Sequence, residues 1–207
     1  MATANHNTGN LEQKIIEAAR ETFLNRGYSE TSMSDIAVRA GINRPTLHYY
    51  FRTKERMFGA VFGSIVGALV PRVKDIILRS DIPIGKRVQL VIDAYYEVFK
   101  ENPRLPLFIV KEIDRDYDNV VRTARELGLQ TYMDSIRKGL QDEMDSGKLR
   151  QVPMRYLFMT FYSMLIIPFA TCNLCNNLFV AEGECFDDML AEWKAYIVSA
   201  VERTLTI

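Results

Sequence analysis

Apolar residues recur at three- and four-residue spacing along almost the whole chain, and runs of alternating β-branched residues are missing. Because this spacing is that of amphipathic helices, the sequence predicts an all-α fold. In the first predicted helix, from Leu11 to Arg26, one apolar stripe contains Ile15, Ala19 and Phe23. Gly27 then offers a left-handed stop.

The next two predicted helices are short and carry their own capping residues. Ser32 and Asp35 have the spacing of a capping box for a helix over residues 33–40. After one tight turn, Asn43 can cap the next helix. Pro45 is tolerated there, because the backbone donors of a first helical turn are unpaired in any case.

Longer helices are expected beyond residue 53, over about 54–79, 84–101, 104–114, 118–146, 154–176 and 185–205. Pro71 should kink the first of these or end it near Val70, because proline lacks the amide proton that a helix interior uses. Gly128 should break the fourth. The change from short capped helices to long apolar ones places a domain boundary between residues 53 and 54.

The two short helices have the spacing of a helix-turn-helix. Such a pair needs a small residue where the helices cross, a residue that tolerates positive φ in the turn, and apolar anchors. Ala37, Gly41 and Leu47 meet these needs. The amino-terminal half of the second helix is the end that enters a major groove in such motifs. Its outward side chains are Arg44, Pro45, Thr46, His48 and Tyr49.

The run from Ile15 to Phe58 resembles the amino-terminal domain of TetR-type transcriptional regulators. The matching positions are Phe23, Gly27–Tyr28, Thr31–Ser32, Ile36–Ala37, Ala40–Ile42, Thr46–Leu47, Tyr49–Phe51 and Lys54–Glu55. The resemblance implies a three-helix DNA-binding domain at residues 1–53, ordered from about residue 10, and a larger helical ligand-binding and dimerisation domain at residues 54–207. Two positions depart from the family pattern. His48 replaces the usual tyrosine, and Pro45 stands where glycine or a small residue is common.

Several side chains of the resembling segment suit contacts with DNA. Arg44 can donate two hydrogen bonds to guanine, and the ring of Pro45 can touch a thymine methyl group. Hydroxyl, imidazole and ammonium groups can bind phosphates. A helix cap alone is the alternative role for Ser32. The residues expected to bind DNA are Thr31, Ser32, Arg44, Pro45, Thr46, His48, Tyr49 and Lys54.

The charge distribution favours a DNA-binding surface and a dimer. The chain has 26 basic and 26 acidic residues, so its net charge is zero and a polybasic tail is excluded. The segment from Arg39 to Arg56 is nonetheless basic, since Glu55 is its only acid. A protein that neutralises few phosphates needs two subunits to bind tightly. The expected homodimer interface lies on the last two helices, where the uncharged segment from Tyr156 to Ala181 joins an i, i+4 stripe on the last helix. The residues of that stripe are Met189, Trp193, Ile197 and Val201.

The segment from Tyr156 to Ala181 carries no charged side chain and is about as long as a membrane span. Polar residues such as Asn173 and Asn176 interrupt it, and no basic cluster lies on one side. We therefore expect a helix that is buried in the protein or at a subunit interface, and no membrane. The polar first residues lack the pattern of a secretory signal, so we expect a cytoplasmic protein.

Aromatic and methionine side chains are spread over the middle and carboxyl-terminal helices. Any one of them fits a role in the core, but together they suit an adaptable apolar pocket, which the family resemblance implies is an inducer site. The lack of charge in the segment after residue 155 favours a neutral or weakly charged apolar effector. The expected ligand-binding residues are Tyr96, Phe99, Phe108, Tyr132, Phe158 and Tyr162.

The three cysteines are too few and too clustered for a disulfide framework. Cys172 and Cys175 form a C-x-x-C pair followed by Cys185, so a zinc site or a redox switch is an alternative to buried thiols. Neither His6 nor His48 lies nearby in the sequence, and we therefore expect inert thiols and no metal. No P-loop, dinucleotide-binding glycine pattern, H-E-x-x-H or nucleophile elbow occurs, so we expect no catalytic residues and no cofactor.

These features predict a ligand-responsive transcriptional regulator, a homodimeric repressor that a small apolar or aromatic effector releases from a palindromic operator. Ligand in the larger domain would favour a dimer whose recognition helices no longer match the half-site spacing. Two alternatives stay open. One is a small-molecule-binding protein with a vestigial DNA domain, and the other is a cysteine-switched redox regulator.

Overall fold

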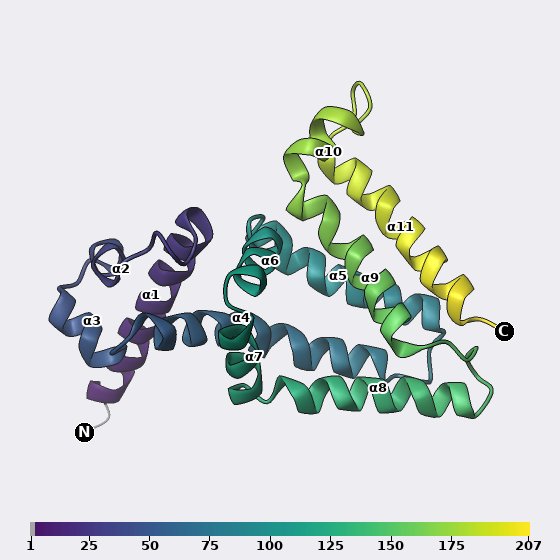
Figure 1. Cartoon of the computed structure of the whole chain (residues 1–207), viewed down its shortest axis with the longest axis horizontal. Coiled ribbons are helices and arrows are strands. Elements are labelled where there is room, and N and C mark those ends of the chain that lie inside the picture. Colours follow the sequence, from purple (N-terminus) through teal and green to yellow (C-terminus); the bar gives the residue numbers. More distant parts are fainter. Residues whose placement is uncertain (1–2) are drawn as a thin grey trace. The chain divides into compact units, whose positions relative to one another are not determined.

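The computed structural model describes residues 3–207, and in this part of the chain every regular element is a helix (Figure 1). The all-α prediction is confirmed. The helices are α1 (Thr3–Arg26), α2 (Met33–Ala40), α3 (Arg44–Tyr50), α4 (Lys54–Ile77), α5 (Ile84–Glu101), α6 (Leu105–Arg115), α7 (Tyr117–Glu126), α8 (Leu129–Asp145), α9 (Met154–Ala170), α10 (Cys172–Leu178) and α11 (Phe186–Leu205).

The chain packs into two compact units. Residues up to 68 together with 112–123 form the first unit, and residues 69–111 together with 124–207 form the second. The chain passes from one unit to the other inside α4, α6 and α7. The boundary expected between residues 53 and 54 separates a DNA-binding domain from a ligand-binding domain by their roles and not by packing. It stays a prediction.

The core of the first unit brings α1 and α2 together with the start of α4. Phe23, Leu47 and Phe58 are fully buried there. The ring of Tyr28 stacks on Phe23 and meets Phe58 edge-on, with centroids 5.6 Å apart in both pairs. Aromatic pairs at these separations and angles are favourable, so they fix the loop between α1 and α2 against the start of α4.

In the second unit α11 packs along α5, and α9 lies beside α11 (Figure 1, green and yellow). A buried ion pair ties three helices together. Both terminal nitrogens of Arg87 on α5 donate to the carboxylate of Glu143 on α8, at 2.6 and 2.7 Å, and one also donates to the carbonyl oxygen of Ile77 at 2.8 Å. This guanidinium satisfies one of the carbonyls that the last turn of α4 leaves unpaired.

The helix α1 begins at Thr3, so its start near Leu11 was predicted about two turns too late. The expectation of order from about residue 10 stays a prediction. An existing helix extends without a new nucleus, which makes further turns inexpensive. α4 likewise runs through Pro71 to Ile77 and does not end near Val70. Tertiary packing holds Leu69 and Val73 buried on either side of the proline, which compensates for the lost hydrogen bond.

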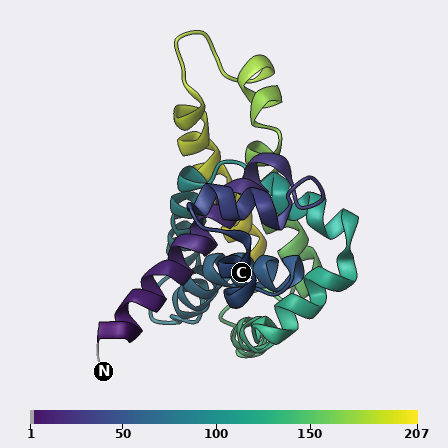
Figure 2. The ribbon, with the colours of Figure 1, turned by 90° about the vertical axis from the view of Figure 1, so that its left-hand side faces the viewer.

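The helix expected over 154–176 is broken in two at Thr171, whose φ of −116° and ψ of 28° are not helical. Pro168 precedes the break and has no amide proton for the carbonyl of Met164. The indole of Trp193 on α11 donates to that carbonyl instead, at 2.9 Å. Figure 2 shows α10 and α11 joined by an extended loop.

The helices of the described part of the chain differ in length and in apolar character. No single helix in this range is both long and apolar enough to cross a bilayer. Only α9 and α10 taken together reach that length, and they are bent by 77° at the break between them.

Candidate nucleic-acid interface and ligand cavity

The helix α2 is capped at both ends by local contacts. Oγ of Ser32 accepts from the amide of Asp35 at 3.1 Å, and a carboxylate oxygen of Asp35 accepts from the amide of Ser32 at 2.8 Å. At the other end Gly41 adopts a φ of +69°, which L side chains rarely allow. The amide of Ile42 then reaches the carbonyl of Ala37 at 3.0 Å. These bonds fix the turn before α3.

The helix α3 is held by a cap and by one buried anchor. Oδ1 of Asn43 accepts from the amide of Thr46 at 2.8 Å, and Leu47 is fully buried. Arg44 and Pro45 are exposed, and 81% of the surface of Tyr49 is accessible. The predicted outward face of α3 is therefore exposed at these three residues, while Thr46 and His48 are half-buried.

Arg44 and His48 lie one turn apart on this face and contact each other. Nε of Arg44 donates to Nε2 of His48 at 3.4 Å, and Nδ1 of His48 lies 3.2 Å from the carbonyl oxygen of Arg52. Because arginine only donates and a carbonyl only accepts, both contacts fit a neutral imidazole with its proton on Nδ1. A phosphate contact from Nε2 therefore requires the imidazole to leave Arg44 and to carry its proton on that nitrogen.

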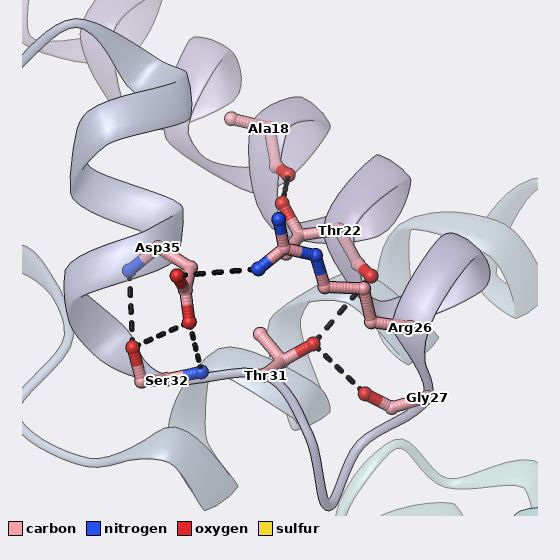
Figure 3. A network of polar contacts seen from close by, with 7 residues as sticks. All are labelled: Ala18, Thr22, Arg26, Gly27, Thr31, Ser32 and Asp35. Atoms are coloured by element: carbon pink, nitrogen blue, oxygen red, sulfur yellow. Dashed lines mark hydrogen bonds and ion pairs between the residues drawn. The ribbon is translucent and has the colours of Figure 1, made fainter.

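Figure 3 shows that Thr31 and Ser32 point in different directions. Thr31 is buried, and its hydroxyl donates to the carbonyl of Gly27 at 2.8 Å. That hydroxyl is committed to the turn after α1, so the geometry does not support the predicted phosphate contact from it. Ser32 is exposed and serves as the cap of α2.

The ammonium group of Lys54 lies against the ring of Tyr28. Its Nζ is 4.2 Å from the ring centroid and 3.4 Å from the carbonyl oxygen of Ser29, to which it donates. The guanidinium carbon of Arg115 lies 4.1 Å from the same centroid. Burial lowers the pKa of Lys54, and the charge of Arg115 lowers it further. Two cations therefore share one aromatic ring at the start of α4.

Acidic groups complete this cluster. The hydroxyl of Tyr28 donates to Oε1 of Glu55 at 3.2 Å, and burial together with that carboxylate raises the pKa of Tyr28 to about 12. Arg115 donates to Glu112 at 2.8 Å. Sequence reasoning missed Tyr28 and Arg115 as partners of Lys54. The pairing depends on tertiary packing, so no spacing of residues along the sequence predicts it.

The second unit contains an apolar cavity of about 60 Å³. It is lined by Val73, Ile77, Ile84, Val88, Val91, Ile136, Leu140, Leu157, Phe158, Phe161, Tyr162, Val201 and Leu205. The structure brings two of the predicted ligand residues to this cavity, Phe158 and Tyr162. The hydroxyl of Tyr162 lies 3.0 Å from that of Tyr95, which the sequence did not single out for ligand binding.

The other four predicted ligand residues do not line this cavity. Tyr96 and Phe99 pack edge-on against Phe169, at 5.1 and 4.9 Å between centroids. Phe108 is buried, and the ring of Tyr132 lies 5.6 Å from the ammonium of Lys74. Helical periodicity identified these side chains as apolar and inward, but it does not say which neighbour each one meets.

Two of the four residues predicted for the dimer interface are buried within a single chain. Ile197 has no accessible surface and Val201 has 3%, because both pack inside one chain. Met189 and Trp193 are half-buried, and Trp193 stacks on Tyr196 at 5.2 Å. The exposed apolar side chains of α9, α10 and α11 with the loop after α10 are Tyr156, Met159, Ile167, Leu174, Leu178, Phe179 and Tyr196.

The cysteines lie in different environments. Cys175 is buried, Cys172 is half-buried and accepts from the side-chain amide of Asn176 at 3.2 Å, and Cys185 is exposed at the start of α11. Burial raises the pKa of the Cys172 thiol, which disfavours the reactive thiolate. Across residues 3–207, no three His, Cys, Asp or Glu side chains are grouped so that they could hold a metal ion.

Sequence similarity to known proteins extends beyond the helix-turn-helix. A sequence model described as bacterial regulatory proteins, tetR family, matches residues 15–61. The transcriptional regulator RutR of Escherichia coli K12 is 30% identical over 167 residues, covering 73% of this chain and 71% of RutR. The transcriptional activator FasR of Mycolicibacterium smegmatis is 30% identical over 89 residues, and this chain spans only 40% of its length.

Solved structures share the fold. The regulator FadR of Bacillus subtilis, solved in complex with stearoyl-CoA, has a TM-score of 0.71 and 19% identity, covering 91% of this chain and 96% of FadR. HlyIIR, a hemolysin II transcriptional regulator, has a TM-score of 0.67 and 19% identity, covering 93% of this chain and 97% of HlyIIR. At these identities the likeness shows a common architecture.

Proposed function

This chain belongs to the tetR family of bacterial regulatory proteins, and from that premise we propose that it is a ligand-responsive, DNA-binding transcriptional regulator. The observation that carries the proposal is the exposed face of α3. Ser32 and Gly41 cap α2 and set the turn before α3, Asn43 caps α3, Leu47 anchors it, and Tyr49 is exposed. A rigid short helix with an exposed basic and aromatic face suits a major groove.

Within this proposal α3 reads bases and its neighbours bind phosphates. Arg44 has the planar fork that pairs with the two acceptors of guanine, and Thr46 and Tyr49 lie on the same helix. Lys54, held on the Tyr28 ring, supplies a phosphate contact. Phosphate contacts set the register of the helix, and base contacts select the sequence.

A homodimer follows from the small size of this surface. Two copies of α3 held about 34 to 36 Å apart would read successive major grooves of a palindrome. We place the interface on the exposed apolar side chains of α9 and α11, among them Met159, Ile167 and Tyr196. In a twofold dimer the same patch of one copy meets that of the other.

The cavity of the second unit is the proposed effector site. Its lining is almost wholly hydrocarbon, which supports a neutral apolar or aromatic effector. The relative named fatty acid metabolism regulator protein and the stearoyl-CoA complex of FadR support an apolar ligand as well. A cavity of about 60 Å³ has room for roughly four to six heavy atoms, so a larger effector must enlarge it.

Enlargement of the cavity by an effector could cause the protein to release its DNA. Val73 and Ile77 line the cavity and belong to α4, the helix that begins at Lys54. An effector that fits only the enlarged cavity shifts the population toward that state. A tenfold loss of DNA affinity requires about 1.4 kcal/mol of differential binding. The protein would then act as a repressor.

The proposal is tested by selecting bound sequences from a random duplex pool with the full-length protein. We expect enrichment of a palindrome whose half-site centres are one helical turn, about 10 base pairs, or a multiple of it, apart. The control protein carries Arg137→Ala, which removes an exposed arginine of α8 and leaves α3 intact. Failure to enrich any sequence would contradict the proposal and favour a small-molecule-binding protein whose DNA domain is vestigial.

A further inference from the structure

The wall of the cavity has one polar side-chain group. Of its lining residues only Tyr162 carries an oxygen or nitrogen beyond the backbone, and the others are aliphatic or phenylalanine side chains. The buried charges of Arg87 and Glu143 lie in the same unit, but they pair with each other and line no part of the cavity. Any directional contact with a ligand side group therefore falls to Tyr162.

Tyr162 does not act alone, because its hydroxyl lies 3.0 Å from the hydroxyl of Tyr95 on α5. Tyr95 is enclosed by aromatic rings, with Phe99 at 5.8 Å and Phe161 at 6.4 Å between centroids. The two tyrosine rings themselves meet edge-on at 6.0 Å. This packing leaves neither ring free to turn its hydroxyl toward another partner without disturbing the aromatic cluster.

The two hydroxyl groups carry more protons than the hydrogen bond between them uses. Two hydroxyl groups carry two protons, and the single hydrogen bond between them uses one. Burial raises the pKa of both phenols, so both protons are retained. In the described part of the chain, neither hydroxyl makes a second hydrogen bond. One O–H donor of the pair is thus left over, and an unpaired donor away from water is costly. When Tyr95 donates within the pair, that donor belongs to Tyr162, the member that lines the cavity.

We propose that Tyr162 donates a hydrogen bond to a neutral acceptor oxygen of the effector, and that Tyr95 positions it by donating to the Tyr162 oxygen. The effector would then be an apolar molecule with a ketone, ester or amide carbonyl. This inference rests on the proposed role of the cavity as the effector site, and it adds the chemical class of the ligand.

The lining of the cavity also indicates which classes of ligand it would exclude. A carboxylate would enter a site whose lining holds no cation, and an ammonium group would find no anion there. An unpaired charge in such surroundings is far more costly than an unpaired hydroxyl. A pure hydrocarbon would fit the walls but would leave the Tyr162 donor without a partner.

In the proposed series of hydrogen bonds, Tyr95 donates to Tyr162 and Tyr162 donates to the ligand carbonyl. The two tyrosines therefore have different roles. Tyr162 touches the ligand and sets specificity. Tyr95 is a positioning residue, since donation from it polarises the Tyr162 hydroxyl and strengthens the next hydrogen bond. Replacing Tyr162 should therefore remove the preference for a carbonyl, whereas replacing Tyr95 should weaken it in part.

The test uses three small probes with the same number of heavy atoms: cyclopentanone, methylenecyclopentane and cyclopropanecarboxylate. Each is titrated into the full-length protein, and the methyl resonances of Val88 and Leu140, which line the cavity, report both location and affinity. In the native protein we expect the ketone and the alkene to shift these resonances and the carboxylate to leave them in place.

The decisive quantity is the ratio of the alkene to the ketone dissociation constant. Tyr162→Phe should lower this ratio about five- to tenfold, as expected for the removal of one hydrogen bond, and Tyr95→Phe should lower it less. Tyr117→Phe, which removes an exposed hydroxyl that does not line the cavity, is the matched control and should leave the ratio unchanged.

Two results would overturn the inference in different ways. An unchanged ratio in Tyr162→Phe, or a carboxylate that binds as tightly as the ketone, refutes the carbonyl contact and leaves the apolar effector site standing. If neither ketone nor alkene shifts the cavity methyl groups, the inference and the effector role of the cavity both fail, while the proposed DNA reading by α3 is unaffected.

Discussion

At the scale of single residues, the most informative contact is the one between Lys54 and Tyr28. The ammonium rests 4.2 Å from the ring centroid, and Arg115 approaches the same ring at 4.1 Å. A cation held in this way has already given up part of its freedom before any DNA arrives. A phosphate contact by Lys54 would therefore cost less entropy than one by a freely solvated lysine.

Lys54→Met should weaken DNA binding to a similar extent for all sequences, because a phosphate contact positions the protein without reading bases. The slope of log affinity against log salt concentration should become shallower by about 0.9 for each phosphate that the protein no longer neutralises. Lys138→Met is the matched control, since Lys138 is an exposed lysine of α8 paired with Asp142. Equal salt slopes for the native protein and Lys54→Met would refute the contact.

At the scale of helices, the sequence predicts best what short-range bonds decide. The ends of α2 and the start of α3 follow from Ser32, Gly41 and Asn43, and each acts on residues within one turn. The same reasoning failed for Ile197 and Val201, which it placed at an interface although both are buried in one chain. An apolar stripe shows that a face is covered, and only the fold shows what covers it.

The break between α9 and α10 shows how one helix depends on another. Pro168 cannot bond the carbonyl of Met164, and the indole of Trp193 on α11 donates to it instead. The indole bond takes the place of the missing amide bond, so the effects of changing Pro168 and Trp193 on stability should not add. Sequence reasoning could not find this pairing, because it joins residues that only tertiary packing brings together.

A double-mutant cycle measures that dependence. Trp193→Phe should destabilise the protein by about 1 kcal/mol through the unpaired carbonyl, in addition to the packing that the smaller ring gives up. In a Pro168→Ala background the restored amide can bond Met164, so the same substitution should cost less. Urea unfolding of the four proteins gives the coupling free energy. A coupling of zero would mean that the indole bond contributes nothing measurable.

At the scale of the whole molecule, the function we propose requires two copies of the chain. Each copy has one α3, and the apolar side chains exposed on α9 and α11 offer a surface that a second copy could cover in a twofold dimer. The sequence predicted that the segment from Tyr156 to Ala181 and the last helix take part, but two of the residues it named on α11, Ile197 and Val201, are buried within one chain. Met159, with 72% of its surface accessible, and Ile167, with 56%, are the better interface candidates.

Met159→Lys combined with Ile167→Lys should convert a dimer into a monomer, because each lysine would have to be buried without a partner charge. Analytical ultracentrifugation over a range of concentrations measures the mass, with 23.8 kDa expected for the variant and twice that for the native chain. Val38→Lys places the same charge at an exposed apolar position of α2 and should stay dimeric. A dimeric double variant would locate the interface elsewhere.

The central claim is that Arg44 on α3 reads bases, and one specificity ratio tests it most directly. The affinity for the selected palindrome is divided by the affinity for a scrambled duplex at the same salt concentration, for the native protein and for Arg44→Ala. The account predicts that the ratio falls roughly 5- to 150-fold for each guanine that Arg44 no longer reads, while binding to the scrambled duplex changes little. A ratio that stays the same in Arg44→Ala would contradict it.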